Sequence, residues 1–178
     1  MRLFVSIDFP EEIRNELHSR LPVLNGWKQT KAGQIHLTLF FIGDCSNEEY
    51  AEISGRLSQI RFQPFQLEIG GLGVFPSRRN PGVLWYGAQK VPVLMELQQQ
   101  ITDKLEPFSK KPLRKKFIPH ITVARRKSKN GTDRQIVELI NRDFTAIKTT
   151  VDDFSLKQST LKPEGSEHVI LQTYPADI

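Results

Sequence analysis

The chain has 178 residues, of which 38% are hydrophobic and 25% are charged, and it carries a formal net charge of +5. This composition is typical of a globular protein, and since no apolar run approaches the ~20 residues of a membrane-spanning helix, we expect no membrane association. Cys45 is the only cysteine, which excludes an internal disulfide, and with no export signal at the start we expect a cytoplasmic protein.

The spacing of apolar residues predicts strands and helices along the whole chain. In order, the expected elements are a strand (2–8), a helix (10–21), a loop (25–33), a strand (34–43), a helix (46–60), two strands (65–69 and 83–87) joined by a turn-rich connection (70–82), a helix (91–105), a basic loop (109–116), a strand (117–125), a short helix (136–140) and two final strands (145–156 and 168–173). Ser46 and Glu49 have the spacing of a capping box, which strengthens the second helix.

This order of elements predicts an α+β fold with mostly antiparallel sheet. No interior stretch has the composition of a linker, so residues 1–178 are expected to form a single domain. Each half contains one strand with the triplet His-x-Thr, and the two histidines are 84 residues apart. The repeat predicts two interleaved lobes related by a pseudo-twofold axis, with the motif strands in a central cleft and the helices outside.

The two triplets lie in apolar, strand-like surroundings, the first at His36 and Thr38 and the second at His120 and Thr122. Because a strand points every second side chain to one face, each histidine is expected to share a face with its threonine. Two imidazoles meeting across a cleft could take one proton from a nucleophile and deliver another to a leaving group.

Such a pair suits hydrolysis of a cyclic phosphodiester, which needs a base and an acid on opposite sides of phosphorus. Histidine can serve in both roles because its ordinary pKa of ~6.5 lies near neutral pH. The threonine hydroxyls could donate to phosphoryl oxygens, and Arg125 offers a bidentate donor for phosphate. The scheme requires neither a metal ion nor a cofactor.

Positive charge is concentrated around the second triplet. Residues 104–129 contain ten Lys or Arg residues and one acidic residue, so this window carries +9 and the rest of the chain −4. Such a patch attracts phosphate-bearing partners. His18, on a polar helix face, and His168, which has no hydroxyl residue two positions later, are interpreted as structural.

Four segments resemble those of one known family, in the same order and over almost the whole chain. They are RLFVSID (2–8), HLTLFFIG (36–43), VFP (74–76) with VLW (83–85), and PHITVAR (119–125). The chain resembles the RNA 2′,3′-cyclic phosphodiesterases, or 2′–5′ RNA ligase-like proteins, of the 2H phosphoesterase superfamily. The resemblance implies a bilobal fold and metal-independent opening of 2′,3′-cyclic phosphate at RNA 3′ ends to leave a 2′-phosphate.

The resemblance also implies a role for each matching residue. His36 would protonate the departing 3′ oxygen and His120 would activate water, while the two motif threonines hold phosphoryl oxygens. Arg125 would bind phosphate, and Phe41 would stack on the terminal base. Phe41 and Arg125 each lie five positions after a histidine, an odd spacing, so each strand is expected to end, bend or bulge in between.

Two other functions are compatible with these residues. One is a 2H enzyme acting on another phosphoester, such as a small cyclic nucleotide or a 2′–5′ linkage made reversibly. The other is a basic module that binds RNA ends without turnover, although binding alone would not need two titratable groups. We expect a monomer without an obligate protein partner, acting on RNA 3′ ends with cyclic phosphate.

Overall fold

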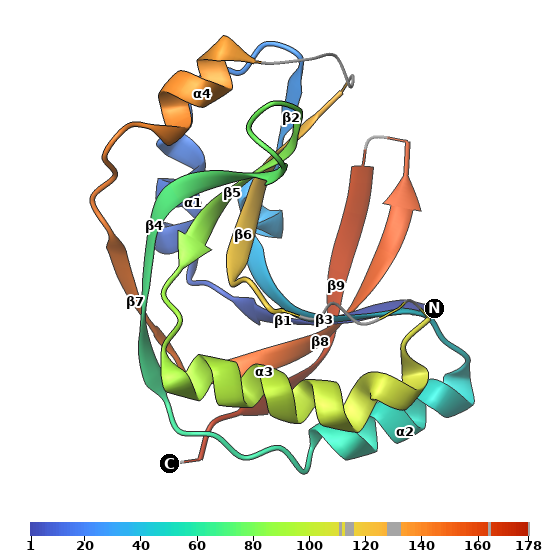
Figure 1. The fold of residues 1–178 in the computed structure, drawn as a ribbon. Coiled ribbons are helices and arrows are strands. Elements are labelled where there is room, and N and C mark those ends of the chain that lie inside the picture. Colours follow the sequence, from blue (N-terminus) through green and yellow to red (C-terminus); the bar gives the residue numbers. More distant parts are fainter. Residues whose placement is uncertain (111, 113–115, 128–132, 164, 178) are drawn as a thin grey trace.

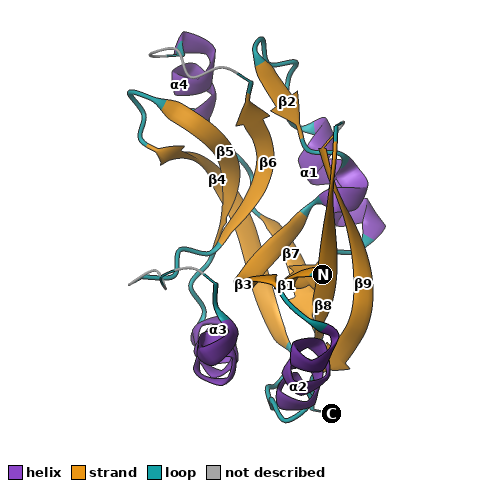
Figure 2. Ribbon diagram, turned by 90° about the vertical axis from the view of Figure 1, so that its right-hand side faces the viewer, coloured by secondary structure: helices purple, strands orange, loops and turns teal. Residues whose placement is uncertain are grey.

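A computed structural model of the chain describes residues 1–110, 112, 116–127, 133–163 and 165–177. Two antiparallel sheets form two lobes, and Figures 1 and 2 show how they splay apart from one another. The helices α2 and α3 lie together beside one end of the lobes, whereas α4 lies at the opposite end (Figure 2).

The strands account for both lobes. The first sheet has the order β3-β1-β8-β9, formed by β1 (Arg2–Asp8), β3 (His36–Asp44), β8 (Asp153–Lys162) and β9 (Gly165–Pro175). The second has the order β2-β6-β5-β4-β7, formed by β2 (Trp27–Gln29), β4 (Phe65–Pro76), β5 (Pro81–Ala88), β6 (His120–Arg126) and β7 (Ile147–Val151). All their pairings are antiparallel, so the predicted α+β class with two mostly antiparallel sheets is confirmed.

The helices lie where the apolar spacing predicted them. They are α1 (Glu11–Ser19), α2 (Asn47–Leu57), α3 (Pro92–Leu105) and α4 (Arg134–Ile140), with short 3-10 turns η1 (Ala32–Gln34) and η2 (Glu106–Phe108). The capping box of α2 is confirmed, because Ser46 Oγ accepts from Glu49 N at 3.2 Å and Ser46 N donates to Glu49 Oε2 at 2.9 Å. Together with the strands, these helices bury one continuous hydrophobic cluster.

Three predicted boundaries were wrong. The expected loop 25–33 contains β2, which forms because Trp27–Gln29 pairs with β6. Most of the expected turn-rich connection 70–82 is instead strand, because β4 continues to Pro76 and β5 begins at Pro81, and the two strands pair. The expected strand 145–156 is divided into β7 and β8, which belong to different sheets, so the chain crosses between the lobes at Asp152. Each difference depends on pairing with a distant segment.

The first motif strand contains a β-bulge directly after its triplet. In β3, Thr38 pairs with Ser6 and Phe40 pairs with Val5, which leaves Leu39 as an extra residue. An extra residue interrupts the strict alternation of side chains. Phe40 therefore turns into the core, and the next residue returns to the face that carries the histidine.

The second motif strand contains the same irregularity at the equivalent place. In β6, Thr122 pairs with Trp85 and Ala124 pairs with Leu84, which leaves Val123 as the extra residue. The break that the odd spacing predicted in each strand is thus confirmed, and in both strands it is a bulge. No helix in the described part of the chain is long and apolar enough to cross a membrane.

Candidate active site

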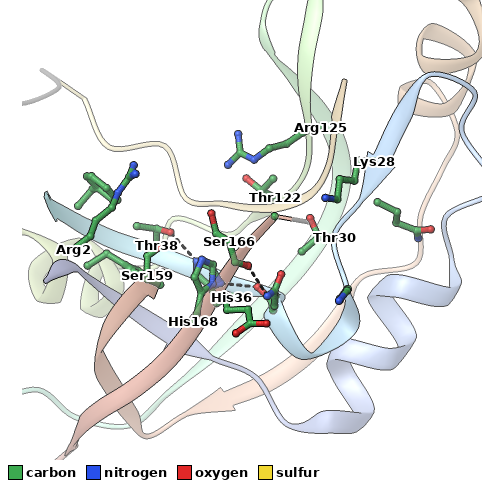
Figure 3. Close-up of a pocket in the computed structure, with 17 residues that line it drawn as sticks. Arg2, Lys28, Thr30, His36, Thr38, Thr122, Arg125, Ser159, Ser166 and His168 are labelled. Atoms are coloured by element: carbon green, nitrogen blue, oxygen red, sulfur yellow. Dashed lines mark hydrogen bonds between the residues drawn. The ribbon is translucent and has the colours of Figure 1, made fainter. Parts of the chain in front are cut away.

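A pocket of about 400 Å³ lies between the two sheets (Figure 3). The first sheet contributes residues of β1, β3, β8 and β9, and the second contributes residues of β2 and β6. Five of the six predicted site residues line it: His36, Thr38, Phe41, Thr122 and Arg125. Residues from both His-x-Thr motifs therefore meet in one cavity.

The ring of His36 is fixed at both nitrogens. Nδ1 lies 2.7 Å from the carbonyl oxygen of Gln34, and because a carbonyl only accepts, Nδ1 carries the hydrogen. Nε2 lies 3.1 Å from Oγ1 of Thr38, two residues along β3. In the neutral ring this leaves Nε2 as the basic nitrogen, turned toward the hydroxyl that lines the pocket.

Burial and nearby positive charge act together on His36. They lower its pKa from 6.5 to about 3: burial has the largest effect, followed by the ammonium of Lys157, while the bond to Gln34 acts in the opposite direction. His168 and Arg125 lower it further. His36 is therefore a neutral imidazole at pH 7 in the unliganded protein.

The second histidine has a similar local geometry. Nδ1 of His120 lies 2.7 Å from the carbonyl oxygen of Ile118, so Nδ1 carries the hydrogen and Nε2 is again the basic nitrogen of the neutral ring. His120 and Thr122 pair regularly with β5 at Gly87 and Trp85, so their side chains share one face. Thr122 lines the pocket but His120 does not; His120 lies on the same face of β6, two residues before Thr122.

The bulges bring Phe41 and Arg125 to the pocket. Without the extra residue in each strand, both side chains would point to the face opposite their histidine. Arg2 lies over the ring of Phe41, with its guanidinium carbon 5.0 Å from the ring centroid, a favourable cation–π geometry. This contact was not predicted from the sequence.

The sequence interpretation of His168 as only structural does not describe its position. His168 lines the pocket on β9, and its ring centroid lies 5.1 Å from that of His36 (Figure 3). Burial and Lys157 lower its pKa. No motif marks His168, because its neighbourhood depends on the pairing of β8 with β1 and of β1 with β3, which brings the β8–β9 hairpin close to the first motif.

Lys157 is a second residue that sequence reasoning missed. It is 5% exposed and forms an ion pair with Asp8, which is paired with His36 in the register of β1 and β3. A lysine directly after the largely apolar run Phe154–Leu156 is the one sequence signal that could have drawn attention to this position.

Within the described ranges, no group of three or more His, Cys, Asp or Glu side chains could hold a metal ion. Several members of the basic window, at positions 111, 114, 115 and 129, lie outside the described residues. Of those described, Arg125 lines the pocket, while Lys110 pairs with Glu49 on α2 at 2.6 Å.

Comparison with known proteins agrees with this arrangement. The model of the 2′-5′ RNA ligase superfamily matches residues 9–161. The chain is 35% identical over 177 residues to an RNA 2′,3′-cyclic phosphodiesterase of Archaeoglobus fulgidus, covering 98% of this chain and 99% of that protein. The chain is 32% identical to the enzyme of the same name from Thermotoga maritima, and the match covers 96% of this chain and 93% of that protein.

Solved structures share the fold. The crystal structure of a Thermus thermophilus protein, TT0787, superimposes with a TM-score of 0.81 at 28% identity, covering 98% of this chain and 97% of that one. A crystal structure described as a phosphoesterase gives a TM-score of 0.82 at 25% identity, with the same coverage.

Proposed function

Because this chain belongs to the 2′-5′ RNA ligase superfamily, we propose that it hydrolyses 2′,3′-cyclic phosphate ends of RNA to 2′-phosphate ends without a metal ion. The observation that carries the proposal is the meeting of His36 and Thr38 of the first motif with Thr122 of the second in one pocket. That pocket also contains a guanidinium, which suits an anionic substrate.

In the proposed reaction, water attacks phosphorus and the bond from phosphorus to the 3′ oxygen breaks. His120 Nε2 takes the proton of the attacking water, and His36 Nε2 gives a proton to the departing 3′ oxygen. The products are a 2′-phosphate and a free 3′ hydroxyl, and the two histidines have exchanged protonation states. The matching Nδ1 bonds, each 2.7 Å to a carbonyl oxygen, support this use of Nε2 in both rings.

The polar neighbours are proposed to bind the phosphate. Thr38 and Thr122 donate to its non-bridging oxygens, which stabilises the charge that develops in the transition state. For Thr38 this means transferring its hydrogen bond from His36 Nε2 to the substrate. Arg125 offers a planar, bidentate donor to the same group, and Phe41 offers a ring face to the terminal base.

The low pKa of His36 requires that the proton for the leaving group arrives together with the substrate. A bound phosphate adds negative charge beside a ring that burial, together with the positive charge of Lys157, otherwise keeps neutral. We therefore propose that substrate binding and proton uptake by His36 are coupled. The reverse assignment, with His36 as base and His120 as acid, would need no proton uptake by His36.

We further propose that the substrate is an RNA chain rather than a mononucleotide, since Arg2, Lys28 and Lys31 line the same pocket beyond the reacting groups. We also propose that residues 1–178 form a single domain. We expect this domain to act as a monomer in the cytoplasm. The single cysteine is in line with a reducing compartment.

A direct assay would test this function. A labelled RNA ending in 2′,3′-cyclic phosphate is incubated with the protein in EDTA, in parallel with a 2′,3′-cyclic mononucleotide. We expect a 2′-phosphate end to form on the RNA, faster than on the mononucleotide. Absence of product on both would refute the proposal, and product on the mononucleotide alone would favour a small cyclic nucleotide as substrate.

A further inference from the structure

Each motif histidine stands in a triangle of three rings. In the first lobe, the centroids of His36 and Phe4 are 5.1 Å apart, those of His36 and His168 are also 5.1 Å apart, and those of Phe4 and His168 are 4.9 Å apart. The ring planes of His36 and His168 meet at 81°, an edge-to-face contact.

The second lobe repeats this triangle with different residues. The centroid of His120 lies 5.0 Å from that of Phe75 and 6.1 Å from that of Trp85, and the last two are 5.0 Å apart. The contact of His120 with Phe75 is edge-to-face at 88°. Phe75 therefore contacts the ring of His120 edge-to-face in the same way as His168 contacts the ring of His36.

The topology supports the same correspondence. Phe4 lies on β1, the strand that pairs with the first motif strand, and Trp85 lies on β5, the strand that pairs with the second. The third ring comes from farther across each sheet, from His168 on β9 and Phe75 on β4. The two lobes thus build the same support from residues that share ring shape but not polarity.

We propose that His168 is a positioning residue, which holds the imidazole of His36 edge-on so that Nε2 stays turned toward the pocket. The inference rests on the proposed function, because it assigns His168 a part in the reaction of His36. Shape is what the two lobes have in common, since Phe75 has no nitrogen. In addition, Nδ1 of His168 is buried and has no hydrogen-bond partner in the described part of the chain. The position of His168 therefore does not depend on a hydrogen bond from this nitrogen.

An unpaired buried nitrogen costs stability, typically ~1–3 kcal/mol, so this nitrogen does not stabilise the fold. What His168 contributes to the site is its ring, which makes an edge-to-face contact with the ring of His36. Because a reacting group displaced by about 1 Å can cost ~10²-fold in rate, loss of the supporting ring should lower turnover strongly.

The test compares three substitutions of His168 with one control on the same strand. H168A and H168Q remove the ring, H168F keeps it without nitrogen, and V169A alters a neighbour that is 58% exposed. We expect kcat to fall by roughly 10–100-fold in H168A and H168Q with KM little changed, because misplacing the acid affects the chemical step. H168F should stay within about threefold of wild type, since it keeps an aromatic ring that can make the same edge-to-face contact, and V169A should be unaffected.

Two outcomes would overturn the proposal. Wild-type kcat in H168A would remove His168 from the reaction, and an H168F as impaired as H168A would mean that a nitrogen, not the ring, is needed. H168Q supplies the same comparison with H168F if alanine leaves the chain unfolded, and thermal unfolding monitors the fold of each variant.

A second readout does not depend on turnover. The ring signals of His36 in NMR spectra, assigned with H36N, should broaden through ring motion in H168A and H168Q and stay sharp in H168F. If wild-type protein failed to open cyclic phosphate, the proposed function would fall while this measurement still tested the positioning. His36 signals that stay sharp in H168A would contradict the positioning role of His168.

Discussion

Lys157 reaches from β8 to Asp8 on β1 and forms a largely buried ion pair, with side-chain exposures of 7% and 23%. Asp8 is paired with His36 in the strand register, so this ion pair lies on the same sheet face as the first motif. The positive charge acts on both His36 and His168, whose pKa values it lowers. The pair thus links the stability of the first sheet to the protonation of the site.

Removing this lysine should destabilise the protein. Lys157→Met leaves the Asp8 carboxylate without its cation, and loss of one partner of a buried pair typically costs about 3–5 kcal/mol. Urea denaturation would measure the free energy of unfolding. Lys148→Met is the matched control, because the Lys148–Glu68 pair is 70% and 42% exposed, and such pairs contribute less than about 1 kcal/mol. Equal effects in the two variants would contradict this account of the ion pair.

The stability of the protein should depend on pH through His36. Its pKa is about 3 in the folded protein and ~6.5 when unfolded, so between these values the unfolded chain binds more protons. The stabilisation is complete above pH ~6.5 and is lost as the pH falls toward 3, with a slope approaching about 1.4 kcal/mol per pH unit. Urea denaturation at a series of pH values should show a shallower slope in His36→Asn. Identical slopes in the two proteins would show that His36 is not held neutral.

Anion binding should be accompanied by proton uptake. Sulfate mimics the charge of phosphate but does not itself titrate near neutral pH, so any proton taken up comes to the protein. Titration calorimetry at pH 7 in two buffers of different ionisation enthalpy should reveal uptake in wild type and none in His36→Asn. Absence of uptake in wild type would instead favour His36 as the base.

Alanine substitutions of Phe41 and of its neighbour Phe40 should affect different properties, RNA binding in the first case and folding stability in the second. Phe41→Ala removes a ring of the pocket and should weaken RNA binding by ~1–3 kcal/mol, the usual contribution of one stacked base. Phe40 is 6% exposed in the core, so Phe40→Ala should cost about 3–5 kcal/mol of folding free energy instead. Fluorescence anisotropy with a labelled RNA and thermal unfolding would separate the two effects. A binding defect confined to Phe40→Ala would mean that the bulge does not set which ring faces the substrate.

Features encoded locally were predictable from the sequence. The capping box of Ser46 and Glu49 and the helical spacing of α3 depend only on residues a few positions apart. The repeated His-x-Thr triplet was equally visible, and the equal offsets of Phe41 and Arg125 indicated an irregularity in both strands. The pairing partners then determined that each irregularity is a bulge.

The rest depends on contacts between distant segments. The last two strands are consecutive in the chain, but nothing near residue 168 indicates that β8 pairs with β1 and so carries this histidine to His36. The division at Asp152 was also missed, although two aspartates interrupt the apolar alternation there and it resumes out of phase at Phe154. Lys157 reads as a surface residue until its pairing with Asp8 places it in the interior.

The most direct test of the central claim is the single-turnover rate on RNA with a 2′,3′-cyclic phosphate end, measured in EDTA for wild type, His36→Asn and His120→Asn. RNA affinity is measured alongside, and added imidazole tests whether the missing group can be replaced. Each substitution should lower the rate by roughly 10²–10⁴-fold, the usual effect of a general acid or base, while binding is largely retained. A wild-type rate in either variant would contradict catalysis by the paired histidines.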